Sequence, residues 1–229
     1  MIGRTTLLVA LLAGGLASPT TTFAQTTDAD PRLLEAIDLY TGVTGVVDDD
    51  RARMLLEAAA ADPGNTLSTM WIARVHSTGR MTFERDEERA RSIAAGVIDA
   101  VRDLAAQGDV EATFLMGTAY DEGLGYPIDH PEAMRWYLRA AAMGHVLAVH
   151  NVGNMHRDGR GTEVDMEAAT MWWLRAARAG DVIPALRLGE AYEAGNGVPQ
   201  KLDEARRWYG VAAAAGNAAA AEALGRIGR

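Results

Sequence analysis

The sequence predicts an all-α solenoid built from stacked pairs of helices, and two periodic features predict it. Glycines recur every 36 residues, at Gly108, Gly144, Gly180 and Gly216. An aromatic doublet keeps the same step, at Trp136-Tyr137, Trp172-Trp173 and Trp208-Tyr209. A fixed period of this length is typical of repeat proteins in which each unit is a helix, a turn and a second helix. We therefore expect about five such units, followed by a capping helix.

Each regular repeat carries the periodicity of two amphipathic helices. In the copy that spans 180–215, Ala185, Leu188, Gly189 and Tyr192 have the i, i+3, i+4, i+7 spacing of one helix face. A glycine inside a helix costs about 1 kcal/mol relative to alanine, so its recurrence predicts that a neighbouring helix approaches too closely for a side chain. The expected repeat core comprises Gly117, Tyr120, Trp136, Gly153, His156, Trp172, Gly189, Tyr192 and Trp208.

The aromatic doublet has two readings. A row of tryptophans could form a platform on which sugars stack, but Trp136, Trp172 and Trp208 fall at the same core position of every second helix. The regular spacing therefore favours core packing. Trp173 stands where the other two copies have tyrosine, and we expect it to be partly exposed.

The stretches on either side of the regular repeats follow the same plan less strictly. Residues 31–107 are interpreted as two degenerate repeats, of which the first opens at Pro31, a residue favoured in the first turn of a helix. Residues 87–107 carry an unbroken apolar stripe, which predicts a helix about two turns longer than its regular counterparts. Three full repeats occupy 108–216, and 217–229 form the capping helix that terminal repeats commonly supply.

Residues 1–24 have the pattern of a secretory signal peptide, and 25–30 form a short polar linker. Arg4 supplies a positive charge, Leu7–Ala13 a short apolar segment, and Ala24 ends a stretch of small residues before the expected cleavage. The apolar segment is too short to cross a hydrocarbon core of about 30 Å, although an uncleaved N-terminal anchor is the alternative. We expect a periplasmic or secreted protein that does not insert into a membrane once the signal is removed.

The composition narrows the possible partners. The chain has 229 residues, a net charge of −9 and no cysteine. Without disulfides, the fold must be held by packing. An acidic surface repels nucleic acid and anionic lipid headgroups, so we expect neither as a partner. Solubility alone is the other explanation of the acidity.

The sequence contains no arrangement typical of catalysis, a cofactor or a metal. The three serines outside the signal peptide, Ser68, Ser77 and Ser92, do not lie in a Gly-x-Ser-x-Gly turn. Each Gly-x-Gly motif lies between two expected helices, whereas a dinucleotide loop follows a strand. His150 and His156 are six residues apart and face different sides of one helix. We therefore expect no enzyme, no cofactor and no metal site.

The remaining face of the first helices is the candidate binding surface. In stacked helix pairs the first helices line the concave side, where extended ligands bind. Polar residues that lie off the core stripe there suit recognition of a peptide main chain, although a solvated face without a ligand is the alternative. The candidate groove residues are Thr118, Glu122, Asn151, Asn154, Asp158, Arg187 and Glu190.

The repeat pattern LGxxYxxGxGVxxDxxxAxxWYxxAAxxG resembles the Sel-one-like repeat, a relative of the tetratricopeptide repeat, over about residues 108–229. Two residues depart from the pattern, since His156 replaces the usual tyrosine and Thr162 the usual valine. The resemblance implies a right-handed α-α superhelix. It also implies an exported interaction scaffold or adaptor that binds a protein or peptide in its concave groove, as relatives do in cell-envelope assembly and signalling.

Two other functions remain open beside the scaffold. One is binding of a cell-wall or polysaccharide fragment. The other is hydrolysis of cell-wall or β-lactam substrates, which the resemblance implies only for secreted relatives rich in cysteine. The absence of cysteine argues against the hydrolase.

Overall fold

The computed structural model describes residues 29–43, 45 and 47–228, and these residues form eleven helices and no strand. The signal peptide and most of the linker expected at 1–30 lie outside the described residues. The helices are α1 (Pro31–Thr41), α2 (Asp49–Ala60), α3 (Thr66–Thr78), α4 (Glu87–Ala106), α5 (Val110–Glu122), α6 (His130–Ala142), α7 (Val146–Asp158), α8 (Met166–Arg178), α9 (Ala185–Ala194), α10 (Leu202–Ala214) and α11 (Ala218–Ile227). No helix of the described part is long and apolar enough to cross a membrane.

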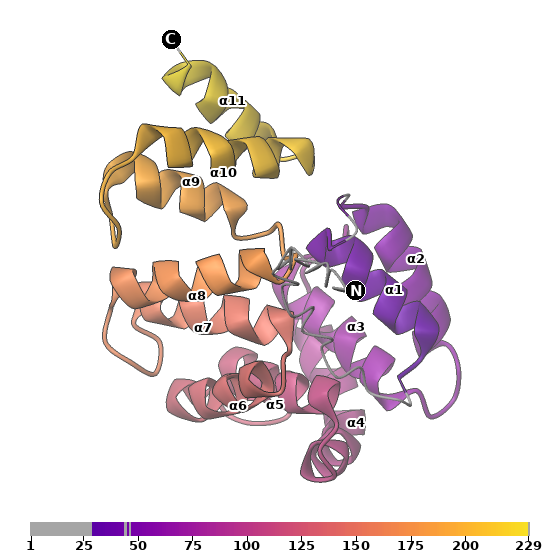
Figure 1. The fold of residues 1–229 in the computed structure, drawn as a ribbon. Helices are drawn as coiled ribbons and strands as arrows, with labels where there is room; N and C mark the ends of the chain where they lie inside the picture. The colour runs from indigo at the N-terminus through magenta and orange to yellow at the C-terminus, as the bar shows by residue number, and fades with distance from the viewer. Residues whose placement is uncertain (1–28, 44, 46, 229) are drawn as a thin grey trace, which may run out of the picture.

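The helices stack as five hairpins, from α1/α2 to α9/α10, and α11 covers the last of them (Figure 1). This is the right-handed superhelix with a capping helix that the periodicity and the resemblance predicted. The long helix is also confirmed, since α4 has 20 residues and the other helices have 10 to 13. The stack curves so strongly that α1 reaches the segment between α8 and α9 (Figure 1).

Local signals set the helix ends. Aspartate side chains accept a hydrogen bond from a backbone amide in the first turn of six helices, which satisfies donors that have no partner inside the helix. These caps are Asp30, Asp48, Asp86, Asp109, Asp129 and Asp165. Each first helix of a hairpin ends at a glycine with φ between 67° and 73°, a conformation that side chains disfavour. The hairpin turn is therefore encoded in each repeat.

The glycine inside each regular first helix admits an aromatic ring from the second helix of the same hairpin. A Cβ on Gly117 would lie 2.5 Å from the ring of Tyr137, and a Cβ on Gly189 would lie 2.5 Å from the ring of Tyr209. The expected close approach is confirmed, and the atoms that need the space belong to the aromatic doublet.

The second residue of each doublet, and not only the first, fills the core. Trp173 is 1% exposed and lies against Gly153, where a Cβ would meet its ring at 2.6 Å. The expectation that Trp173 is partly exposed is wrong. Trp172 is half-buried and packs at the edge of the core instead. The reason is geometric, because only the second position of the doublet points at the glycine of the paired helix.

Candidate binding surface

The candidate groove residues lie on α5, α7 and α9, and their exposure increases along the stack. Thr118 on α5 is fully buried, Asn151 and Asn154 on α7 are half-buried, and Glu190 on α9 is exposed. The face is thus covered at α5, where α3 packs beside it, and open at α9. We call this face of the first helices the inner face.

Thr118 does not belong to a groove. Its hydroxyl donates to the carbonyl of Phe114 at 3.5 Å, and the hydroxyl of Tyr137 donates to Thr118 Oγ1 at 3.3 Å. Both neighbours are fully buried. The proposed role of Thr118 in binding is therefore wrong, because the tight curvature buries this turn of α5 inside the molecule.

On α7, the two asparagines differ in what they can offer a ligand. Asn154 Oδ1 accepts a hydrogen bond from Trp173 Nε1 at 3.2 Å, so it holds a core ring in place. Asn151, which is half-buried, forms no such bond among the described residues. Asp158, at the end of the helix, accepts from the guanidinium of Arg157 at 2.5 and 2.7 Å. That ion pair lowers the pKa of Asp158.

On α9, Arg187 and Glu190 are exposed one turn apart. The surroundings partly desolvate the Arg187 guanidinium, which lowers its pKa, and the positive charges of Arg157 and Arg80 lower it further. The negative charges of Glu190 and Asp158 partly offset this by raising the pKa of Arg187. Arg187 therefore lies near charged side chains of α7 and near Arg80, which follows α3.

Glu122, at the end of α5, is half-buried rather than freely exposed. Its carboxylate accepts a hydrogen bond from the hydroxyl of Ser77 on α3. Burial raises the pKa of Glu122, while the charges of Arg74 and Arg80 oppose that rise. Glu122, Ser77 and Arg80 line a cavity of about 440 Å³ between the ends of α3 and α5.

Arg74 and Arg80 were not among the candidate residues predicted from the sequence. Arg74 stands five residues before the glycine that ends α3, Gly79, just as Glu190 stands five before Gly195. It therefore occupies the same repeat position as Asn154 and Glu190. Extending the repeat register into the degenerate copy would have found it.

Arg74 is a buried cation without a hydrogen-bonded partner at two of its nitrogens. Its side chain is 5% exposed, and its guanidinium carbon lies 4.5 Å from the ring centre of Trp71 and 5.2 Å from that of Phe114. Nε and Nη1 have no hydrogen-bond partner. The aromatic rings stabilise the charge through their electron-rich faces, but they do not satisfy its donors.

Arg80 follows the turn after α3. Its Nη1 donates to the hydroxyl of Tyr40 at 2.5 Å. Besides the cavity beside Glu122, it lines a second cavity of about 270 Å³ together with Asp49 of α2 and Val182 and Ile183 of the α8–α9 connection. Arg80 thus lies between the N-terminal hairpin and the start of α9.

Among the described residues, three histidines each pair with one carboxylate, whereas His76 lies against the carbonyl of Glu84. His145 Nε2 lies 2.9 Å from Glu111 Oε2, and His150 Nδ1 lies 2.9 Å from Asp181 Oδ2. These pairs are buried and tie one hairpin to the next. In the described part of the chain, no three histidine, aspartate or glutamate side chains come together in a way that could hold a metal ion.

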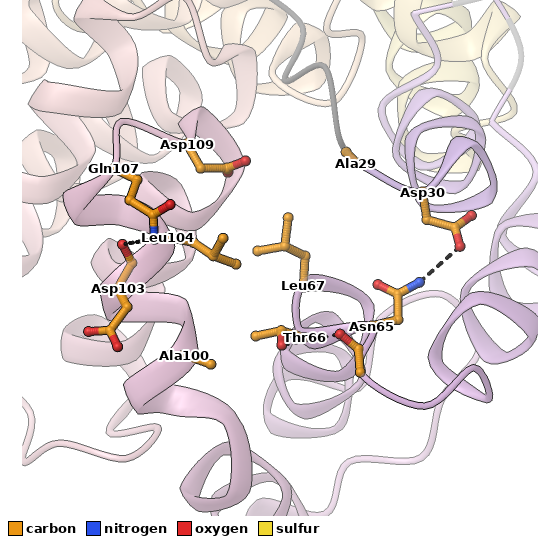
Figure 2. Close-up of a pocket in the computed structure, with 11 residues that line it drawn as sticks. Ala29, Asp30, Asn65, Thr66, Leu67, Ala100, Asp103, Leu104, Gln107 and Asp109 are labelled. Carbon is orange, nitrogen blue, oxygen red and sulfur yellow. Dashed lines mark hydrogen bonds between the residues drawn. The ribbon is translucent and has the colours of Figure 1, made fainter.

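A cavity of about 560 Å³ opens beside the starts of α1 and α3 and the end of α4 (Figure 2). Its polar side chains serve the fold, since Asn65 Nδ2 donates to Asp30 Oδ2 at 2.9 Å and Gln107 Nε2 donates to the carbonyl of Asp103 at 3.1 Å (Figure 2). Asp109 caps α5. The polar side chains that line this cavity are therefore explained mainly by their roles at helix ends.

Stacked helical hairpins with a repeated glycine–aromatic contact define an α-solenoid repeat protein. The Sel1 repeat model matches residues 39–62, 110–145, 146–181 and 185–217, which together are more than half of the chain. The chain belongs to the Sel1 repeat family, whose members generally act as scaffolds for protein interaction. The first matched segment falls within the degenerate N-terminal copies.

Solved structures agree with this assignment. A protective antigen of uropathogenic Escherichia coli strains with an SLR fold has a TM-score of 0.56 at 24% identity, over 86% of this chain and 48% of that protein. A Sel1 repeat protein from Oxalobacter formigenes has a TM-score of 0.55 at 29% identity, over 79% of this chain and 50% of that protein. The chain therefore matches about half the length of each. No curated protein matches it.

Proposed function

We propose that this chain is an interaction scaffold that binds a protein or a peptide on its inner face. The observation that carries the proposal is the open part of that face. Asn151 and Arg187 occupy the same repeat position on the adjacent first helices α7 and α9, and Glu190 lies one turn after Arg187; all three are at least partly accessible to solvent. The other side of these helices packs into the core, where a glycine of each helix contacts an aromatic ring of the paired helix.

The chemistry of the face suits a peptide. The Asn151 amide can both donate and accept a hydrogen bond, as a peptide main chain requires. Arg187 and Glu190 beside it offer charges of both signs for side chains. Family membership supports the same role, since Sel1 repeats generally mediate protein interaction.

We further propose that the protein is exported to the periplasm or beyond the cell. The support is the sequence of residues 1–24, with its positive charge, short apolar segment and small residues before the expected cleavage. N-terminal sequencing of protein from the envelope fraction tests this, with Gln25 expected as the first residue. Protein that retains Met1 in the cytoplasm contradicts it.

A crosslinking experiment tests the scaffold role. A photo-reactive amino acid placed at position 151 should attach covalently to one protein in an envelope extract of the source organism. The same group at position 171 is the matched control, because Met171 is exposed on α8, a second helix. A protein that crosslinks at 151 and not at 171 supports binding on the inner face. Equal patterns at both positions, or no product at 151, refute it.

A further inference from the structure

The inner face carries a group of arginines without carboxylate partners. Most arginines of the described residues form an ion pair with an aspartate or glutamate. The others form none within the described structure. Four of these lie on the second helices α4, α6 and α8, whereas Arg74, Arg80 and Arg187 lie on or directly after the first helices α3 and α9. Pairing of most cations is expected in a protein of net charge −9. The exceptions on this face therefore need an explanation.

These three arginines lie near one another. The guanidinium carbons of Arg74 and Arg80 each lie 6.0 Å from the ring centre of Tyr40, and the charge of Arg80 also acts on Arg187. Arg80 also lines a cavity with Val182 and Ile183, which directly precede α9. The elements that carry these arginines therefore lie close together where the curved stack brings α1 to the connection before α9 (Figure 1).

The carboxylates nearby form no ion pair with these three arginines in the described structure. Both oxygens of Asp158 are already bonded to Arg157. Glu122 accepts a hydrogen bond from Ser77, and burial raises the pKa of Glu122 and of Asp49. Glu190 is exposed to solvent on α9. Arg74 Nε and Nη1 have no hydrogen-bond partner, and neither Arg80 nor Arg187 forms an ion pair in the described structure, so these guanidinium groups keep donors that an external anion could satisfy.

We propose that the inner face binds an acidic peptide segment, whose carboxylates pair with Arg80 and Arg187 above the buried charge of Arg74. The planar guanidinium group matches a carboxylate with two parallel hydrogen bonds. Asn151 lies on α7, between the arginines of α3 and α9 in the order of the stack, where it can bond the peptide main chain. This inference rests on the proposed scaffold function and names the chemistry of its partner.

Fluorescence anisotropy with labelled decaglutamate and decaglutamine peptides tests the proposal. The wild-type protein should bind decaglutamate at low salt at least about tenfold more tightly than decaglutamine, since hydrogen bonds between charged partners are stronger than those between neutral ones. Half-molar salt should weaken the binding, because it screens exposed charges. Equal affinity for the two peptides overturns the proposal.

Matched double variants locate the site. Arg80→Gln with Arg187→Gln should lower the affinity for decaglutamate at least about tenfold. Arg139→Gln with Arg175→Gln removes the same charge from the second helices α6 and α8, and should change the affinity less than about twofold. Circular dichroism should show the same helix content in both. Equal losses in the two variants overturn the proposal.

Three results distinguish this inference from the scaffold role. If a protein crosslinks at position 151 and its binding does not depend on Arg80 and Arg187, the scaffold stands and the acidic partner is wrong. If polygalacturonate binds more tightly than decaglutamate and is lost in the same variant, the ligand is an anionic polysaccharide and the peptide assignment is wrong. If position 151 crosslinks to nothing, the scaffold role itself fails.

Discussion

The carbonyl oxygen of Thr41 accepts a hydrogen bond from the amide of Val182 at 3.1 Å. Thr41 ends α1 in the first hairpin, and Val182 lies just before α9 in the fifth. Repeats in a solenoid ordinarily contact only their neighbours. This contact therefore joins the two ends of the curved stack and limits how far the inner face can open.

Gly42, beside this contact, should not tolerate a side chain. It has a φ of +70°, and a Cβ there would lie 2.5 Å from Cγ2 of Val182. Gly42→Ala therefore adds a steric clash to backbone strain, and we expect a loss of about 2–4 kcal/mol in the free energy of unfolding. Urea denaturation followed by circular dichroism measures it.

Gly64 provides the control for this substitution. Its φ is +85°, but a Cβ there would meet nothing within 4 Å. Gly64→Ala should therefore cost only the backbone strain, about 1–2 kcal/mol. If both variants lose the same stability, the contact between Gly42 and Val182 contributes nothing.

Two glycines of the last hairpin should respond to alanine in opposite directions. At Gly189 a Cβ would clash with the ring of Tyr209 at 2.5 Å, whereas at Gly210 it would meet nothing within 4 Å. We expect Gly189→Ala to destabilise the protein by about 1–3 kcal/mol. Gly210→Ala should stabilise it by up to about 1 kcal/mol through helix propensity. Urea midpoints that shift in the same direction for both contradict the close-contact explanation.

The repeat period was enough to predict the fold because each repeated residue has a structural role that depends only on its near neighbours in the chain. The glycines at 123, 159 and 195 end helices, and those at 117, 153 and 189 make room for a ring. Such tasks depend on residues a few positions apart in the chain. A period in the sequence therefore translates directly into a stack of hairpins.

The candidate site was predicted less well because it depends on how strongly the stack curves. Thr118 and Asn154 share a repeat position, yet Thr118 is fully buried and Asn154 is half-buried. The difference arises from α3, which packs beside α5. Likewise, Arg74 is recognisable as an inner-face residue only when Gly79 is aligned with the regular repeats. No pattern within one repeat reports the curvature of the whole array.

The two tryptophans of the central doublet should differ in their effect on stability. Trp173 is almost fully buried against Gly153, whereas Trp172 is half-buried. Trp173→Ala should cost about 3–5 kcal/mol, as expected for a large core cavity. Trp172→Ala should cost clearly less, because part of its ring is already in contact with water. Equal shifts of the urea midpoint would show that both rings contribute alike to the core.

Glu193 should make the attachment of the capping helix dependent on pH. Hydrogen bonds from Arg226 of α11 and from Tyr209 of α10, the latter at 2.6 Å, lower the pKa of Glu193 to about 2. The folded-state pKa lies below the ordinary value of 4.5, so the ionised carboxylate stabilises the fold above about pH 4.5. That contribution is lost as the pH falls toward 2. Glu193→Gln should therefore lower the melting temperature modestly at pH 7, and its difference from wild type should shrink steadily between pH 4.5 and 2.

Glu190→Gln is the matched control for this pH dependence, because Glu190 is exposed on the same helix, α9. It removes the same charge without touching the contact with α11, so its melting temperature should stay close to that of wild type at pH 7. Solvent screens the pair of Glu193 with Arg226, which keeps the expected effect small. A Glu193→Gln variant whose melting temperature differs from wild type by the same amount at pH 7 and at pH 2.5 would contradict the role of the ionised carboxylate.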